Sequence, residues 1–208
     1  MRRLRETLKM GKKLILVVVA HPDDETIWAG GSLLRFGDKF KKTIICLCRK
    51  RDKERAERFK RACKILHAKG HISDLDDSEN GSYKNISSIE IIKRILKITK
   101  RKSYDFIFTH GEKGEYGHIR HIEVHNAILE MLNKGILSAR RVFFFSYKKM
   151  ENDFQGWGTY NSNADKLIKL NRDELSMKKN LIKNIYGFKE GGFEEKSSGE
   201  IEAFDVKK

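Results

Sequence analysis

The chain has 208 residues, of which 35% are charged and 39% are hydrophobic, and its formal net charge is +15 at pH 7. This composition is typical of a folded protein with a heavily charged surface, and it excludes an intrinsically disordered chain. The length predicts a single domain over residues 1–208, with a less regular part from about residue 150. The positive charge attracts anions in general, and it equally fits a charged surface without a specific role.

Apolar runs alternate with helix-like periodic segments along most of the chain. Strands are predicted at residues 14–20, 43–48, 104–109 and 141–147. Helices are predicted at residues 26–36, 52–69, from 87 or 88 to about 100, 121–133 and 165–186. A loop is expected at residues 74–83, and residues 187–208 show no regular pattern. Strands that alternate with helices predict an α/β fold, in which helices cover both faces of a mainly parallel sheet.

The N-terminal segment is basic over residues 1–13 and apolar over residues 14–20, an order that secretory signal peptides share. The apolar run is short and has no small-residue cleavage site after it, so we interpret it as a buried strand. Cys46, Cys48 and Cys63 lack the spacing of a disulfide framework or of a zinc cluster. We therefore expect a reduced, cytoplasmic chain, and no stretch is long enough to predict a transmembrane segment.

The first polar cluster, residues 21–25, reads His-Pro-Asp-Asp-Glu and directly follows the first predicted strand. Pro22 is the only proline in the chain, which indicates that the backbone needs a fixed φ at this point. Neighbouring carboxylates repel one another unless a positive charge lies among them, and a divalent metal ion supplies such a charge. The alternative is an ordinary helix start, with Asp24 as the N-cap and Glu25 in the first turn.

The second polar cluster, residues 110–121, contains three of the seven histidines and is rich in glycine. Histidine offers neutral nitrogen ligands at physiological pH, and Gly114 and Gly117 allow tight turns. A surface or cap position would explain a lone histidine, but three around a Gly-rich loop favour a binding site. We interpret His110 and His125 as a loop residue and a helix-face residue.

Both clusters follow a predicted strand, and ligands of such sheets bind at the carboxyl ends of the strands. The two clusters are therefore expected to lie together. In combination they offer two histidines and one carboxylate to a metal ion and leave positions for water and substrate, as a catalytic zinc site requires. The other Asp of the pair is then available to take a proton from the water.

Two short motifs stand at these positions. Residues 20–25 read Ala-His-Pro-Asp-Asp-Glu, and residues 117–121 read Gly-His-Ile-Arg-His. This order resembles the PIG-L/LmbE-like metal-dependent N-deacetylases, whose second motif is Gly-His-Pro-Asp-His, and the resemblance covers roughly residues 14–147. It implies a Rossmann-like three-layer sandwich with a mainly parallel sheet. It also implies a zinc-dependent hydrolase that removes the N-acetyl group from an N-acetylglucosamine-type amino sugar or its conjugate.

The resemblance implies a role for each motif residue. The implied metal ligands are His21, Asp24 and His121. Zn²⁺ is the expected ion, although two histidines and a carboxylate also accept Fe²⁺, Co²⁺ or Mn²⁺. Asp23 would be the general base, and Tyr116 would stabilise the developing oxyanion together with the metal. His118 would add positive charge there or help to protonate the leaving amine.

Substrate contacts are also implied. Arg55 would be presented to the substrate by its helix, and Asp77 falls where the family often has a sugar-binding Asp. Arg120 replaces the family Asp that orients the neighbouring imidazole of His118. Either another carboxylate supports His118, with Glu115 nearest in the sequence, or Arg120 faces a substrate anion.

Other functions fit the sequence less well. The main alternative is a catalytically impaired family member that binds a sugar or a metal. Net charge alone suggests a nucleic-acid-binding protein, and a nucleotide-binding enzyme would need a G-x-G-x-x-G motif after a strand. The expected partner is therefore a small amino-sugar substrate, which the basic surface allows to be anionic, and no specific nucleic acid. We interpret the Gly-rich segments 156–158 and 191–195 as packing loops in preference to loops that close over a sugar.

Overall fold

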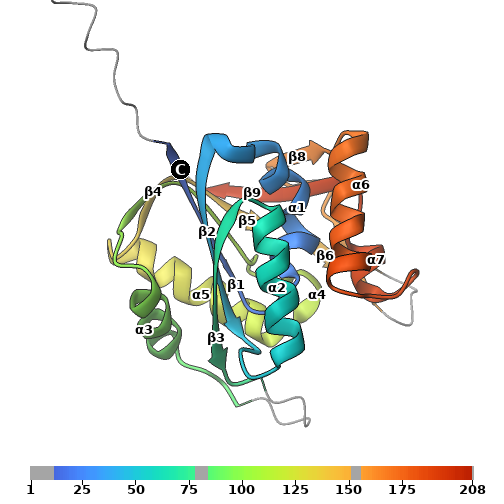
Figure 1. Ribbon diagram of the computed structural model, residues 1–208. Helices are drawn as coiled ribbons and strands as arrows, with labels where there is room; N and C mark the ends of the chain where they lie inside the picture. The colour runs from blue at the N-terminus through green and yellow to red at the C-terminus, as the bar shows by residue number, and fades with distance from the viewer. Residues whose placement is uncertain (1–11, 78–83, 151–155, 208) are drawn as a thin grey trace, which may run out of the picture.

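The computed structural model describes residues 12–77, 84–150 and 156–207, which form a three-layer α/β sandwich (Figure 1). Within these residues, seven strands form one sheet in the order β3 (Ala68–Leu75), β2 (Phe40–Cys48), β1 (Lys13–Val19), β4 (Ser103–Thr109), β5 (Ser138–Phe145), β9 (Ile201–Lys207) and β8 (Lys166–Lys169). The strands from β3 to β5 pair in parallel, whereas β9 pairs antiparallel with both β5 and β8.

Helices cover both faces of the sheet. One face carries α1 (Asp24–Phe36), α2 (Lys53–Ile65) and α6 (Arg172–Asn180), and the other carries α3 (Ser88–Ile98) and α5 (Ile119–Asn133). A hydrophobic core lies on each face of the sheet. In β1, Ile15, Val17 and Val19 belong to the core under α1 and α2, and Leu16 and Val18 belong to the core under α3 and α5. All five are fully buried, which places β1 at the centre of a sheet that is covered on both sides.

Shorter elements connect these layers. They are the 3₁₀ turn η1 (Gly37–Lys39), α4 (Gly114–Gly117), the antiparallel pair β6 (Tyr147–Lys149) and β7 (Gly158–Tyr160), the π-helical turn η2 (Leu181–Ile185) and α7 (Phe193–Ser197). In the parts of the chain that the structure describes, no helix has the length and apolar character needed to cross a membrane.

The prediction of an α/β fold with a mainly parallel sheet is confirmed, but the helix predicted at residues 52–69 is wrong at its end. α2 stops at Ile65, and the unpredicted strand β3 follows. His67 has a φ of 51°, a left-handed conformation that ends the helical path. β3 then pairs in parallel with β2 at the edge of the sheet, where polar side chains are tolerated and hide the strand pattern. Residues 78–83 of the loop predicted beyond it lie outside the described residues.

The C-terminal prediction is also corrected. The helix predicted at residues 165–186 begins only at Arg172, because Lys166–Lys169 form β8. Residues 187–208, expected to be irregular, contain α7 and β9, and Ala203 and Phe204 of β9 are fully buried. β9 exists because it pairs with β5, far away in the sequence, so no local pattern indicates it.

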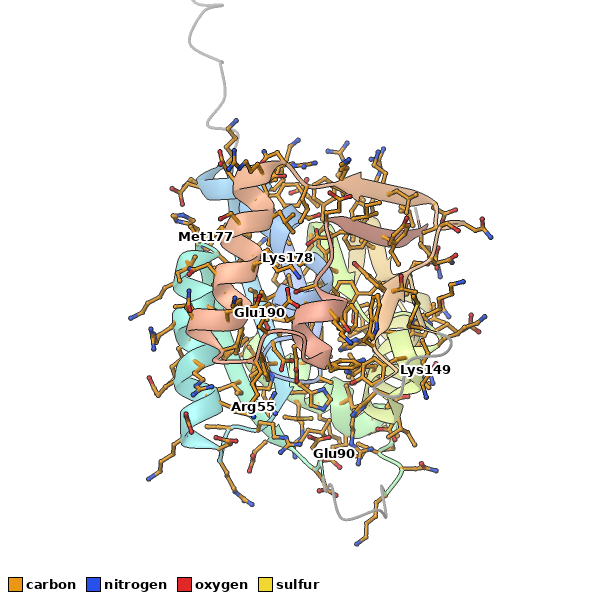
Figure 2. The ribbon with its side chains drawn as sticks, turned by 90° about the vertical axis from the view of Figure 1, so that its right-hand side faces the viewer. Arg55, Glu90, Lys149, Met177, Lys178 and Glu190 are labelled. Carbon is orange, nitrogen blue, oxygen red and sulfur yellow. The ribbon has the colours of Figure 1, made fainter. Side chains whose placement is uncertain are left out.

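A buried ion pair fastens the C-terminal elements to α1. Lys178, labelled in Figure 2, belongs to α6. Its Nζ lies 2.9 Å from Oε1 of Glu202, on β9, and both side chains are fully buried. The Glu202 carboxylate also accepts hydrogen bonds from the backbone N–H groups of Gly31 and Ser32, each at 2.8 Å. Glu202 of β9 therefore anchors α1, the helix that contains part of the first polar cluster.

Candidate functional site

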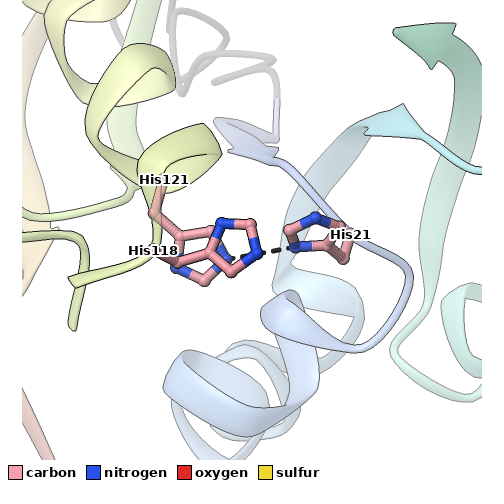
Figure 3. A group of neighbouring side chains, drawn as sticks. All are labelled: His21, His118 and His121. Atoms are coloured by element: carbon pink, nitrogen blue, oxygen red, sulfur yellow. Dashed lines mark hydrogen bonds between the residues drawn. The ribbon is translucent and has the colours of Figure 1, made fainter. Parts of the chain in front are cut away.

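The two polar clusters lie together at the carboxyl ends of β1 and β4, which are neighbours in the sheet. Figure 3 shows His21 on one side of this edge and His118 and His121 on the other. This edge is where sheets of this kind bind ligands.

Three side chains from the clusters come close enough to share a metal ion. Nδ1 of His21 lies 3.1 Å from Nε2 of His121. The first nitrogen lies 3.4 Å from Oδ2 of Asp24, and the second lies 3.4 Å from Oδ1 of the same carboxylate. Ligand atoms at the usual distances around a tetrahedral zinc ion are about 3.3–3.6 Å apart. All three residues are buried. The predicted ligands are therefore brought together with spacings that fit a divalent metal.

Two further histidines adjoin this group. Overlapping sets that could hold a metal are His21, His118 and His121, and Asp24, His110 and His121. Nε2 of His110 accepts a hydrogen bond from the backbone N–H of Ala20 at 2.9 Å, and its Nδ1 binds Glu115 at 2.8 Å. Since the backbone N–H of Ala20 occupies Nε2 and Glu115 occupies Nδ1, this arrangement favours a supporting role for His110 over that of a metal ligand.

Glu115 lies behind His121. Its carboxylate accepts hydrogen bonds from Nδ1 of His110 and from the N–H of Gly111, both at 2.8 Å, and from Nδ1 of His121. Nε2 of His121 therefore faces Asp24. Although burial raises the pKa of Glu115, His110 and His121 lower it to about 2, so the group is a carboxylate at neutral pH.

Asp77 lies behind His21. Its Oδ1 is 3.1 Å from Nε2 of His21, and its Oδ2 accepts a hydrogen bond from Nε of Arg49 at 2.7 Å. Although burial lowers the pKa of His21, Asp24 and Asp77 raise it to about 10. In the metal-free molecule a proton on Nδ1 of His21 therefore points at His121, and a metal ion bound between the two rings would displace it.

Asp23 has an unusual backbone. Its φ of 137° is rarely adopted by residues other than glycine and costs free energy. Its carbonyl oxygen accepts hydrogen bonds from the N–H groups of Thr26 and Ile27, so Asp23, and not Asp24, is the N-cap residue of α1. Its own N–H donates to Glu25 at 3.2 Å, and Glu25 accepts the Tyr186 hydroxyl at 2.6 Å.

The Asp23 carboxyl group lies in the same buried pocket as Asp24. Oδ2 of Asp23 accepts a hydrogen bond from the guanidinium of Arg55 at 2.7 Å. Burial and the neighbouring Asp24 raise the pKa of Asp23 well above its usual value, against the effect of Arg55. A carboxylate with a raised pKa is a better proton acceptor, which suits the role of general base.

His118 and Tyr116 lie beside the histidine and aspartate cluster. Nδ1 of His118 accepts a hydrogen bond from the N–H of Arg120 at 3.2 Å and so caps α5. Burial, together with His121 and His21, lowers the pKa of His118 to about 3, so the ring is neutral. Burial raises the pKa of the Tyr116 hydroxyl, which therefore keeps its proton and can donate it in a hydrogen bond.

Residues 16–132 match the family model described as PIG-L: GlcNAc-PI de-N-acetylase. The chain belongs to the PIG-L family. Members of this family are metal-dependent carbohydrate N-deacetylases. A comparison with curated proteins finds no match.

Solved structures share the fold over nearly the whole chain. N,N'-diacetylchitobiose deacetylase from Pyrococcus horikoshii has a TM-score of 0.67 and 16% identity, and the match covers 98% of this chain and 90% of that chain. The conserved protein TT1542 from Thermus thermophilus has a TM-score of 0.64 and 17% identity, covering 92% and 93%. The A40926 pseudoaglycone deacetylase Dbv21 has a TM-score of 0.62 and 13% identity, covering 94% and 98%. These likenesses show an LmbE-like, Rossmann-type fold.

Arg120, at the position of the family Asp, is buried inside the protein. Its side chain is 0% exposed and donates to the carbonyl oxygens of Asp76 at 2.8 Å and Lys84 at 3.0 Å, and to Glu123 at 2.6 Å. These contacts tie residues 76 and 84 to α5 and favour a structural role for Arg120 over contact with a substrate anion. Glu115 binds His110 and His121, which favours support of those two rings over support of His118.

Asp77 was expected to contact the sugar. Its side chain is only 5% exposed, and its two oxygens are engaged by His21 and Arg49. This arrangement favours a role in holding His21 over a direct contact with a sugar.

A cavity of about 160 Å³ opens beside the cluster. The residues that line it are His21, Asp23, Asp24, Ile27, Arg49, Arg55, Tyr116, His118, Phe193 and Glu194. Phe193 and Glu194 come from α7, outside the residues that match the family model. The interpretation of residues 191–195 as a packing loop is thus incomplete. The signal in the sequence was an aromatic residue followed by two acids after a glycine pair.

Proposed function

We propose that the chain is a zinc-dependent hydrolase that removes the N-acetyl group from an N-acetylglucosamine-type amino sugar or its conjugate. One observation carries this proposal: Nδ1 of His21 and Nε2 of His121 lie 3.1 Å apart in a buried cluster beside Asp23, and each lies 3.4 Å from one of the two carboxylate oxygens of Asp24. Membership of the PIG-L family supports the reaction class. Zinc suits this donor set, and Fe²⁺, Co²⁺ or Mn²⁺ are chemically acceptable substitutes.

When bound, a divalent ion acts as a Lewis acid on the acetamide carbonyl and makes a water molecule more acidic. Asp23 accepts the proton that this water loses as its oxygen attacks the carbonyl carbon. Arg55 holds the Asp23 carboxylate at 2.7 Å and fixes its direction. The C–N bond then breaks, and Asp23 returns the proton to the departing nitrogen. The products are acetate and the free amino sugar.

Hydrogen-bond donors are needed where the carbonyl oxygen gains negative charge. Tyr116 and His118 line the same cavity as Asp23. Because Nδ1 of His118 accepts a backbone hydrogen bond, the neutral ring carries its proton on Nε2 and acts as a donor. The lowered pKa of His118 makes it a weak base, so the proton transfers belong to Asp23.

The cavity walls favour a sugar. Phe193 offers an aromatic face, and Glu194 offers a carboxylate that accepts hydrogen bonds from hydroxyl groups. Arg49 and Arg55 add positive charge, which favours a substrate that carries an anionic group. A cytoplasmic setting belongs to the same proposal and agrees with the three free, buried cysteines.

The second candidate is a catalytically impaired family member that binds a metal or a sugar. One observation favours it. Arg120 stands where the family has the Asp that orients the imidazole of His118, and its backbone N–H contacts that ring.

Acetate release from a panel of N-acetylglucosamine derivatives, neutral and phosphorylated, distinguishes the two candidates. We expect the purified chain to release acetate only when Zn²⁺ is present, and Asp23→Ala to release none while still binding the metal. Binding of Zn²⁺ without acetate release from any derivative would favour the impaired family member instead.

A further inference from the structure

We propose that Glu115 and Asp77 are positioning residues, which hold the rings of His121 and His21 by opposite nitrogens so that one metal-binding nitrogen of each ring faces the other. The inference rests on the metal site of the proposed function. Both carboxylates lie outside the motifs at residues 20–25 and 117–121.

Glu115 determines which nitrogen His121 presents. It is 2% exposed, and its carboxylate accepts a hydrogen bond from Nδ1 of His121. The ring must therefore carry a proton on Nδ1, and Nε2 is left to face Asp24 at 3.4 Å. A carboxylate that binds the second nitrogen of a ligand histidine is a common way to fix its tautomer and direction.

His110 makes this arrangement rigid. Because its Nε2 accepts the N–H of Ala20, the proton of the ring lies on Nδ1, which donates it to Glu115. The N–H of Gly111 holds the other carboxylate oxygen at 2.8 Å. Glu115 is thus anchored by donors that cannot reverse their direction, and the end of β1 is connected to His121.

Asp77 does the same for His21 from the opposite side. It binds Nε2 of His21 at 3.1 Å, so the nitrogen that faces His121 is Nδ1. Arg49 holds the second oxygen of Asp77 at 2.7 Å. The Asp77 side chain is 5% exposed, so solvent competes little for this contact.

Replacing either carboxylate by an amide should disturb one ring and leave the ligand atoms themselves in place. A Gln or Asn side chain has one oxygen acceptor, and its NH₂ group would face an N–H donor. The affected histidine can then turn or shift its proton to the nitrogen that should bind the metal. Loss of such a partner typically weakens metal binding by about 10–100-fold.

The test measures the Zn²⁺ dissociation constant of full-length Glu115→Gln and Asp77→Asn by competition with a chromophoric chelator. Nitrogen-15 spectra of histidine-labelled protein report the tautomer of each ring. We expect a loss of about 10–100-fold in affinity for each variant, with the tautomer disturbed at His121 in the first and at His21 in the second.

Matched controls separate positioning from a general loss of structure. Glu112→Gln changes an exposed acid on the same loop as Glu115, and Asp76→Asn changes the exposed neighbour of Asp77. Ile128→Val removes one methyl group from the core of α5 and lowers stability without touching the site. All three should bind Zn²⁺ like the wild type.

Unchanged Zn²⁺ affinity in both Glu115→Gln and Asp77→Asn would overturn the inference, as would an equal loss in Ile128→Val. If Glu115→Gln does not fold, Asp77→Asn alone decides. A wild-type chain that binds Zn²⁺ and releases no acetate contradicts the proposed reaction and leaves this test valid. A wild-type chain that binds no Zn²⁺ overturns both.

Discussion

His118 has two separable tasks, since one ring nitrogen caps α5 and the other is available to donate a hydrogen bond. Asn is also a good N-cap, so His118→Asn should keep the cap and remove only the donor. We expect kcat for acetate release to fall about 100-fold, while the free energy of unfolding changes by less than about 0.5 kcal/mol. His118→Ala should lose the cap as well, at a further cost of about 1 kcal/mol.

Enzyme kinetics and urea unfolding of the two variants measure these effects. An unchanged kcat in His118→Asn would remove His118 from the mechanism.

Asp77 should stabilise the metal-free chain in a pH-dependent way. Although burial raises its pKa, His21 and Arg49 lower it from 3.8 to about 2, so the folded chain binds this proton less tightly than the unfolded chain does. The stabilisation of the folded chain by the ionised Asp77 carboxylate is therefore complete above about pH 4 and is lost as the pH falls towards 2. Asp77→Asn should lower the free energy of unfolding by about 2 kcal/mol at pH 6 and by much less at pH 2–3. Urea unfolding across this range measures it, and a difference that is constant with pH would contradict the argument.

At the residue scale, the motifs predicted which groups meet but not what supports them. The positions of the two clusters beside strand ends predict that they meet, and the family resemblance implies which members, His21, Asp24 and His121, are the ligands. A sequence does not reveal the direction of a side chain, so the protein contacts of Arg120 and Asp77 could not be predicted. Arg120 binds a backbone carbonyl, and Asp77 binds His21.

Among the elements, the loop after β4 leaves no room for a side chain at Gly111. A Cβ atom on Gly111 would lie 2.1 Å from the carbonyl oxygen of Phe145, so the backbone would have to move. Gly111→Ala should therefore cost more than about 2 kcal/mol and displace Glu115, which binds the Gly111 N–H. Gly199→Ala is the control, since nothing lies within 4 Å of the added Cβ. Thermal unfolding and Zn²⁺ affinity check both variants, and equal behaviour of the two would contradict the prediction.

Elements formed by local patterns were predictable, whereas those formed by distant pairing were not. β1 and α5 have apolar periodicities that indicate their type. β3 is half-exposed at the edge of the sheet and follows a helix, so its first residues, Ala68 and Lys69, continue the helical pattern and are predicted as part of that helix. β8 and β9 depend on each other and on β5, which lies more than 50 residues before β9.

For the whole molecule, the Lys178–Glu202 pair joins the C-terminal elements to the helix that carries the site. Lys178→Met should leave the Glu202 charge buried without its cation and cost about 3–5 kcal/mol. The double variant Lys178→Met, Glu202→Gln removes that charge and should recover part of the loss. Urea unfolding of both measures this, and a single variant as stable as the wild type would contradict it.

The central claim, that one divalent ion at this edge of the sheet enables amide hydrolysis, is tested most directly by metal titration. Zn²⁺ is added stepwise to the metal-free chain, and bound metal and acetate release are measured at each step. The account predicts that activity rises with the first equivalent of bound Zn²⁺ and then levels off, and that His121→Ala shows neither binding nor activity. Acetate release that does not depend on added metal, or full activity in His121→Ala, would contradict it.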